Sequence, residues 1–529
     1  MVSFGSTLEG VDQPGAGQRT PDGLHSGQDR WQSAIYLLAL AVSIAVWFIA
    51  VRFPLWLDET GSYWQISAGF SQIWPRRFAT LSFPAYSYVL WLWSKLFGTG
   101  EIAFRSLSIL AMLAATWLLY RAAREIFDRD CALVAVTAFC LNPIVVFASI
   151  DVRPYAFGIL ATNAAIYILF RLRRDHSNLL AMLFGVAAAC ILYFHLIFGA
   201  ILPALILGFI FVKWGDRRVF WRQLGFALLA FALAFLPLIP QILYLLHTAG
   251  THVYEPAPDL QRLVAAFLPT WAWVYFGAAA LLVFAVTTLL TRLKARSKRG
   301  ESPNLIGLAA ERWRIPVIAT LALVPIFILF GVSVATPMHL FIARHRLVAV
   351  PGLALCWALL LSAFRPRIVR LLFWTAFVAG TTYSNCTAPF SRVHGYTWKF
   401  ALDLAEKNAS IDNAPVLICS DFPESDYAPL PVDSPGKSIF FAQLSYYPLS
   451  VPVVPLPRAL NSVAMEAGTR FLKQAEEKHE RFLALAFYKS YPTLEWLWHS
   501  AEGSYSVRKL TVSNGITVLE FDPRSNLVP

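Results

Sequence analysis

The sequence has 529 residues, of which 57% are hydrophobic and 14% are charged, and its formal net charge is +12. Soluble globular domains carry about 25% charged residues, so this composition excludes an ordinary soluble protein and indicates a membrane protein. The basic residues lie in short clusters between apolar segments, where membrane topology explains them, so we expect membrane lipids rather than nucleic acid as partners.

Residues 1–30 are polar and glycine-rich without a signal-peptide pattern, and we predict a disordered cytoplasmic leader. Apolar runs of a length that can cross a bilayer follow, and they predict a helical bundle of about eleven spans. The runs are 34–51, 102–122, 131–150, 152–172, 178–195, 197–214, 222–246, 271–291, 315–335, 340–363 and 368–386. The apolar segment 84–98 is too short to span, so we place it at the outer face, in an outer loop covering 52–98 with interfacial helices.

The basic clusters fall on every second connection between these runs. They lie near Arg121–Arg129, Arg171–Arg174, Lys213–Arg222, Arg292–Arg299 and Arg365–Arg370. Because cytoplasmic connections are rich in Lys and Arg, this alternation predicts a cytoplasmic N-terminus. An odd number of spans then places the segment after about residue 390 outside, in an integral membrane protein that we assign to the bacterial inner membrane.

The tail has an ordinary proportion of charged residues and soluble-type patterns, and we predict a transmembrane module at 31–390 followed by an extracytoplasmic α/β domain at 391–529. Helices are expected at 397–408 and 462–480 and short strands at 416–419 and 482–487. Asn514-Gly515 between two alternating apolar runs, 507–512 and 516–521, predicts a β-hairpin. The fold class is therefore mainly α, a polytopic membrane bundle with a C-terminal α/β domain.

Asp58 and Glu59 lie just after the first apolar run, at a predicted membrane boundary. Adjacent carboxylates can serve as a general base, a metal ligand or a charge that orients another group, so we predict both as catalytic. The structural alternative is a helix cap, because Asp58 precedes a plausible helix at 60–74 and acidic residues suit the first turn.

Asp151, Arg153 and Tyr155 lie between two spans with almost no loop. Charged residues at this depth are costly unless they are paired or functional. We predict a substrate-binding role, with Arg153 holding a phosphate or carboxylate and Tyr155 donating a hydroxyl; an ion pair that closes the turn is the alternative.

His195, Arg344 and His345 complete the predicted substrate-binding residues. His195 ends an apolar run and could simply pack there, and Arg344 could extend its charge to the interface. The predicted topology, however, places these residues at the same outer face as Asp58, Asp151 and Arg153. This convergence predicts a pocket for an anionic substrate that is lined with arginine and holds a carboxylate.

The order of these motifs resembles the GT-C superfamily of membrane glycosyltransferases, over roughly residues 31–390. The similar families are the protein O-mannosyltransferases (glycosyltransferase family 39-like), the lipid A aminoarabinose transferases and the Rgt-like sugar transferases. The matching stretches are Leu57-Asp58-Glu59, residues 84–98 followed by Arg105 and Ser108, Asn142-Pro143, Ser149 to Tyr155, Tyr193-Phe194-His195, and Arg344-His345 followed by Pro351. The chain departs from the family at Arg344-His345, where many members have Arg-Tyr.

This resemblance implies sugar transfer from a polyprenyl-phosphate donor to an envelope glycan, lipid or protein at the outer face, where nucleotide sugars are not available. It implies Asp58 as the base on the acceptor hydroxyl and an inverting displacement. Some members use a divalent cation, for which Asp58, Glu59 and Asp151 could supply ligands, although their spacing does not define a metal site. The alternative functions are a transporter or flippase of a lipid-linked anion, and a non-catalytic scaffold.

Overall fold

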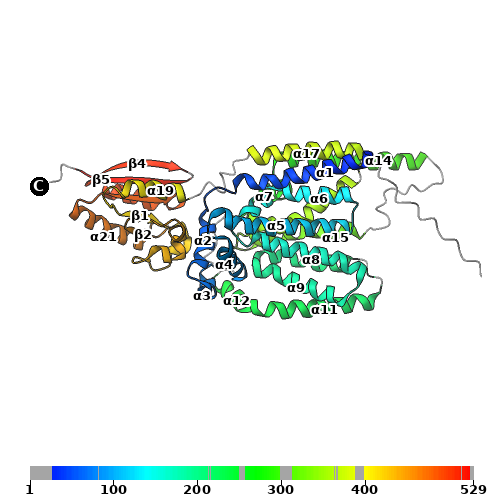
Figure 1. The fold of residues 1–529 in the computed structure, drawn as a ribbon, viewed down its shortest axis with the longest axis horizontal. Coiled ribbons are helices and arrows are strands. Elements are labelled where there is room, and N and C mark those ends of the chain that lie inside the picture. The colour runs from blue at the N-terminus through cyan, green and yellow to red at the C-terminus, as the bar shows by residue number, and fades with distance from the viewer. Residues whose placement is uncertain are drawn as a thin grey trace, which may run out of the picture.

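The structure is a computed structural model that describes residues 27–80, 83–212, 214, 216–248, 256–297, 313–362, 364, 367–387, 398–513 and 515–524. The predicted leader lies outside these residues up to position 26, whereas residues 27–30 form the first turn of α1 (Gly27–Ala45). A helical bundle and a smaller sheet domain lie at opposite ends of the molecule, with the short helices α2, α3 and α4 between them (Figure 1).

The long helices of the bundle run along the long axis of the molecule, and shorter helices connect or extend them (Figure 1). Besides α1 they are α5 (Glu101–Arg124), α6 (Arg129–Leu141), α7 (Pro143–Ile150), α8 (Tyr155–Asp175), α9 (Asn178–Phe194), α10 (Leu202–Phe211), α11 (Arg217–Phe235), α12 (Ile239–Thr248), α13 (Leu260–Phe267), α14 (Trp271–Ser297), α15 (Arg314–Ala335), α16 (Val350–Ser362) and α17 (Arg367–Thr387). The 3₁₀ helices η1 (Val46–Ala50), η2 (Leu196–Ile201), η3 (Leu236–Leu238) and η6 (Ala343–Ala349) extend or link them.

The predicted apolar runs all coincide with helices of this bundle. Within the described residues, six helices are long and apolar enough to cross a membrane, or up to eight if each of two bent pairs is one span. The bent pairs are α6 with α7, at 68°, and α13 with the first part of α14, at 70°. The protein is therefore an integral membrane protein with a helical bundle, as expected, while the count of about eleven spans stays a prediction.

Three short helices cover the end of the bundle that faces the sheet domain (Figure 1). They are α2 (Leu57–Ser67), α3 (Phe70–Thr80) and α4 (Ala85–Phe97). The single helix predicted at 60–74 is divided because Gly69 adopts φ +97°, a conformation that residues with a side chain rarely take. The segment predicted at 84–98 is α4, which ends at Gly98 with φ +85°.

The C-terminal domain is built on a five-stranded sheet with the strand order β2-β1-β3-β5-β4. The strands are β1 (Val416–Cys419), β2 (Val453–Leu456), β3 (Phe482–Phe487), β4 (Tyr505–Ser513) and β5 (Ile516–Pro523). β1 pairs in parallel with β2 and β3, whereas β5 is antiparallel to β3 and β4. The predicted strands and the hairpin are confirmed, with Asn514 itself outside the described residues, whereas β2 was not predicted.

Helices cover both faces of this sheet because alternate strand residues point to opposite sides. On one face α19 (Trp398–Ala409) and α20 (Ala442–Tyr446) pack against Val416, Ile418 and Leu485. On the other face α21 (Ser462–Lys478) and α22 (Tyr491–Ala501) pack against Leu417, Cys419 and Ala484. The helices predicted at 397–408 and 462–480 are α19 and α21, while α22 was not predicted.

The sheet domain docks on α2 through apolar contacts and hydrogen bonds. The side chain of Leu57, at the first position of α2, belongs to the same buried cluster as Ile418 and Phe487 of the sheet. The Trp64 indole donates to the carbonyl of Lys437 at 2.8 Å, and the Tyr447 hydroxyl accepts from the backbone N–H of Leu55 at 2.8 Å. The start of α2 is thus fixed from the side of the sheet domain.

Close helix contacts in the bundle depend on glycine. A Cβ atom on Gly185 of α9 would lie 2.1 Å from the carbonyl oxygen of Ala227 on α11, so these backbones approach too closely for any side chain. We expect Gly185→Ala to cost about 1–3 kcal/mol of stability, as overpacking does. Thermal unfolding in detergent measures the effect. Gly225→Ala is the matched control, since nothing lies within 4 Å of its Cβ position; equal loss in both variants would contradict the prediction.

Candidate active site

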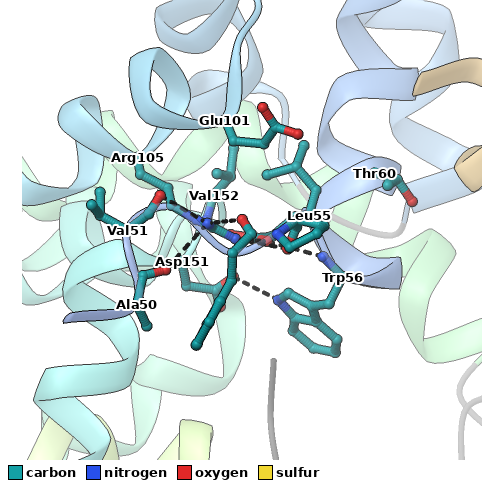
Figure 2. Close-up of polar contacts among 12 residues, drawn as sticks. Ala50, Val51, Leu55, Trp56, Thr60, Glu101, Arg105, Asp151 and Val152 are labelled. Carbon is teal, nitrogen blue, oxygen red and sulfur yellow. Dashed lines mark hydrogen bonds and ion pairs between the residues drawn. The ribbon is translucent and has the colours of Figure 1, made fainter. Parts of the chain in front are cut away.

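Arg105 of α5 fixes the turn that leads into α2. Its guanidinium is completely buried and donates to the backbone carbonyls of Val51 at 3.0 Å, Pro54 at 3.1 Å and Phe53. Figure 2 shows this side chain beside the end of η1, at Ala50 and Val51. The carbonyls at the end of a helix lack partners within the helix, so one buried arginine both satisfies them and holds the following turn.

Glu59 is the anionic partner of Arg105. Their side chains are both 0% exposed and form an ion pair with an Nη2–Oε2 distance of 2.8 Å. The carboxylate also accepts from the backbone N–H groups of Trp56, at 3.1 Å, and Val152, at 3.0 Å. The hydrogen bonds of this carboxylate are therefore structural. They cap α2 and link it to α5 and to the turn before α8.

Asp58 lies at the second position of α2 and its carboxylate has a different environment from that of Glu59. Its Oδ2 atom accepts from Nη1 of Arg344 on η6 at 2.8 Å, and the two side chains are 21% and 30% exposed. The Oδ1 atom makes no hydrogen bond with the described residues. Asp58 is therefore a partly accessible carboxylate that is oriented by an arginine and retains one free oxygen.

Asp151 and Arg153 lie beside Asp58, in the turn between α7 and α8. The carboxylate of Asp151 is 0% exposed and accepts from the Trp56 indole at 3.0 Å, a contact drawn in Figure 2. Nη1 of Arg153 donates to the backbone carbonyl of Asp58 at 3.3 Å. Within the described residues, Oδ2 of Asp151 and Nε of Arg153 are buried without a hydrogen-bond partner. Buried polar atoms of this kind call for a bound polar group or water.

The aromatic rings of Tyr155, His195 and His345 lie next to the arginines. The His195 ring lies 5.2 Å from Tyr155 and 5.4 Å from His345, measured between ring centroids. Nδ1 of His345 lies 2.7 Å from the carbonyl of Leu340, so in the neutral ring Nδ1 carries the proton and Nε2 is an acceptor. Nδ1 of His195 is buried with no partner among the described residues.

The structure thus brings the predicted site residues into one region at the end of the bundle that faces the sheet domain. Asp58, Asp151, Arg153 and Arg344 are joined directly or through Trp56, and Tyr155, His195 and His345 lie beside them. Sequence reasoning missed Trp56 and the structural importance of Arg105. The signal for Arg105 was available, because an arginine inside an apolar run requires a buried partner.

The three carboxylates that could serve as cation ligands do not fit that role together. Every hydrogen bond that Glu59 makes is to Arg105 or to a backbone N–H group, and Asp151 is bound by Trp56. Within the described part of the chain, no group of three or more His, Cys, Asp or Glu side chains is arranged to hold a metal ion. A cation shared by Asp58, Glu59 and Asp151 is therefore not supported by their arrangement.

Comparisons with known proteins found one family model and several solved structures that are similar to this chain. The family model described as dolichyl-phosphate-mannose-protein mannosyltransferase matches residues 82–244, which hold α4, α5 and the turn with Asp151 and Arg153. The crystal structure of ArnT from Cupriavidus metallidurans bound to undecaprenyl phosphate aligns over 92% of this chain and 98% of its own, with 12% identity and a TM-score of 0.52. The chain therefore shares the fold of ArnT, and its residues 82–244 are similar to the mannosyltransferase family.

Further solved structures align over most of this chain with lower scores. The Archaeoglobus fulgidus oligosaccharyltransferase tethered to an acceptor peptide matches 95% of this chain and 75% of its own, with 12% identity and a TM-score of 0.45. Arabinofuranosyltransferase AftD from Mycobacteria matches 94% of this chain and 41% of its own, with 15% identity and a TM-score of 0.44. Among the curated proteins, no sequence matches this chain significantly. The resemblance to GT-C proteins expected from the short motifs is confirmed.

Proposed function

We propose that this protein is a GT-C glycosyltransferase that transfers a sugar from a polyprenyl-phosphate donor to a hydroxyl of an envelope acceptor, at the outer face of the bacterial inner membrane. In this orientation the N-terminus is cytoplasmic and the sheet domain is extracytoplasmic. The observation that carries the proposal is the pairing of Asp58 with Arg344, because it leaves one carboxylate oxygen free beside two arginines. The acceptor is a lipid, a polysaccharide or a protein.

Asp58 acts as the general base. The acceptor hydroxyl transfers its proton to the free Oδ1 atom while its oxygen attacks the anomeric carbon of the sugar. The bond between that carbon and the phosphate oxygen breaks, and polyprenyl phosphate leaves with both electrons of the bond. A single displacement of this kind inverts the anomeric carbon and needs one base.

Arg153 and Arg344 stabilise the leaving phosphate. Negative charge builds on the phosphate oxygens as the bond breaks, and fixed cationic donors lower the energy of that state more than that of the bound donor. The Nε atom of Arg153 has no partner among the described residues and is available for this contact. Tyr155 and His195 lie beside the arginines as further hydrogen-bonding groups. Undecaprenyl phosphate is the molecule bound by the structurally similar ArnT.

Glu59 has a positioning role in this scheme. Its carboxylate is fully occupied by Arg105 and by two backbone N–H groups, so it is not free to take a proton from the acceptor. It holds the first turn of α2, and with it the Asp58 carboxylate, at the end of the bundle.

The test is an assay with purified protein in nanodiscs and polyprenyl-phosphate sugars extracted from native membranes. We expect free polyprenyl phosphate and glycosylated acceptor in equal amounts, both detected by mass spectrometry with native envelope material as the acceptor. Absence of both products with every lipid-linked sugar would overturn the proposal. Movement of an intact lipid-linked sugar into sealed vesicles without a covalent product would instead indicate a transporter.

Arg344 gives the first quantitative prediction for this activity. We expect Arg344→Met to lower kcat/KM about 10²–10³-fold, the usual effect of removing one donor that stabilises developing charge. Steady-state release of polyprenyl phosphate measures the change. Arg344→Lys retains the charge without the forked geometry of the guanidinium, so its kcat/KM should lie between those of the wild type and the Met variant. Wild-type kcat/KM in the Met variant would exclude Arg344 from this role.

A further inference from the structure

The carboxyl ends of three parallel strands carry one charged residue each, at equivalent positions. Asp421 is two residues past the end of β1, Arg458 two residues past β2, and Lys489 two residues past β3. The parallel register aligns Cys419 of β1 with Leu456 of β2 and runs β3 in the same direction. The three side chains therefore start from the same edge of the sheet, the edge at which open α/β sheets bind ligands.

Hydrogen bonds hold the segments after these strands together. The backbone N–H of Ser420 donates to the carbonyl of Leu456 at 2.9 Å, and the Ser490 hydroxyl donates to the carbonyl of Ser420 at 2.8 Å. The Thr493 hydroxyl donates to the carbonyl of Arg458 at 3.2 Å. This network fixes the backbone under each of the three charged residues, so the edge is a preformed surface.

The three charged side chains at this edge are not tied up in ion pairs or hydrogen bonds of the described residues. Within the described residues, the side chains of Asp421, Arg458 and Lys489 form no hydrogen bond and no ion pair, although all three are half-buried. The Lys489 ammonium lies 5.8 Å from the centroid of the exposed Tyr488 ring, a cation–π contact that leaves its hydrogen-bond donors free. Burial raises the pKa of Asp421 to about 7, the charges of Arg458 and Lys489 lower it, and that of Asp58 raises it. Two partly buried cations face one carboxylate at this edge, and none of the three is held in an ion pair with the described residues, so the site is net positive.

This edge faces the site in the bundle. Phe422, next to Asp421, packs against the cluster of Trp64, Ile439 and Ala442 that joins α2 to the sheet domain. Leu57, next to Asp58, lies in the same core as Ile418 at the end of β1. The electrostatic effect of Asp58 on Asp421 agrees with this arrangement. A molecule bound at the edge is therefore adjacent to the carboxylate proposed as the base.

We propose that Arg458 and Lys489 bind an anionic group of the acceptor, a phosphate or a carboxylate, and so place a hydroxyl of that acceptor at Asp58. This inference rests on the proposed glycosyl transfer and names the acceptor class as a hydroxylated anion. Arg458 offers forked donors and Lys489 a point charge, a combination suited to phosphate or carboxylate oxygens. Asp421 lowers the affinity for an anion when it is ionised and accepts a hydroxyl hydrogen of the acceptor.

Binding can be tested without turnover, with the full-length protein in nanodiscs and saturation-transfer NMR. The probes are glycerol phosphate, glucuronate and uncharged glycerol. They test whether the site recognises a phosphate, a carboxylate or a hydroxyl without a charge. We expect saturable binding of at least one anion and none of glycerol. The double variant Arg458→Gln/Lys489→Gln should raise Kd at least about a hundredfold, since it removes two charge-assisted hydrogen bonds.

The matched control is Arg470→Gln/Lys473→Gln, which removes one arginine and one lysine from the exposed surface of α21. It should leave Kd unchanged. Equal binding of the anions by the wild type and the Arg458/Lys489 double variant, or an equal loss in the control, would overturn the proposal.

Asp421→Asn gives a change of opposite sign that a folding defect cannot mimic. Removing the negative charge should tighten glucuronate binding about fivefold at pH 8, the effect of about 1 kcal/mol of charge repulsion. Wild-type binding should tighten similarly from pH 8 to pH 6, because Asp421, with its pKa of about 7, gains a proton. The Asn variant should lack this dependence; weaker glucuronate binding in it would contradict the assignment.

Turnover separates this inference from the proposed function. With native acceptor, the Arg458/Lys489 double variant should raise the acceptor KM at least tenfold while kcat changes little. An unchanged acceptor KM in an active enzyme would overturn the inference and leave the proposed transfer intact. Failure of the wild type to form polyprenyl phosphate would instead overturn the proposed transfer, and the anion-binding measurements would still decide whether the edge is a binding site.

Discussion

Replacing Asp58 with asparagine is expected to lower kcat for sugar transfer about 10²–10⁴-fold, the contribution typical of a general base. Asparagine keeps the shape of the side chain and can still accept the hydrogen bond from Arg344, but it cannot take the acceptor proton. The side chain is partly exposed and α2 is held by Glu59 and by the sheet domain, so the variant should remain folded. Release of polyprenyl phosphate measures activity, and gel filtration with thermal unfolding measures integrity.

Asp175→Asn is the matched control for this variant. Asp175 also pairs with an arginine, Arg171, and has a similar exposure of 28%, but it lies at the opposite end of α8. It should retain wild-type kcat. Wild-type turnover by Asp58→Asn would refute the proposed base, and a loss of folded protein in that variant would show that the Asp58–Arg344 pair is structural.

Replacing Glu59 with glutamine is expected to lower the free energy of unfolding by about 3–5 kcal/mol, the cost of removing one partner of a buried ion pair. Arg105 would remain in a site with 0% exposure without its countercharge. The variant should therefore show a large fall in Tm and in the yield of folded protein. Thermal unfolding in detergent, followed by intrinsic fluorescence, measures the change.

Glu466→Gln supplies the comparison for Glu59. Glu466 pairs with Arg470 on the surface of α21, where the two side chains are 73% and 67% exposed, and such pairs contribute about 0–1 kcal/mol. A Glu59→Gln protein as stable as the Glu466→Gln protein, yet inactive, would assign Glu59 to catalysis instead of positioning.

Local patterns predicted the secondary structure well where one physical signal dominates. The strands 416–419 and 482–487 match β1 and β3 residue for residue, because continuous apolar runs between polar segments are typical of strands buried on both faces. β2 escaped prediction because Pro452 and Pro455 flank or interrupt its short apolar sequence. The helix expected at 60–74 was divided by Gly69, whose positive φ a hydrophobic pattern does not reveal.

The sequence predicted that the candidate residues lie close together, but it predicted less of what each side chain contacts. Asp151, Arg153 and Arg344 were identified because charged residues near or within membrane-spanning segments are costly to bury and need partners. The sequence could not separate Asp58 from Glu59, because the difference lies in contacts made with Arg105 and Arg344, 46 and 286 positions away along the chain. Asp421, Arg458 and Lys489 were missed for the same reason: their proximity comes from the pairing of strands distant in sequence.

The docking of the sheet domain on α2 has a consequence for biogenesis. Leu55 is hydrogen-bonded to Tyr447, and Leu57 is buried among residues that extend to Val518, so the turn bearing Asp58 reaches its final form only when the last segments of the chain are in place. Domains form in the order of their synthesis, from the N-terminus. A partly synthesised or truncated chain in the membrane therefore has its helices but not a finished site, and the turn bearing Asp58 is complete only once the sheet domain has folded.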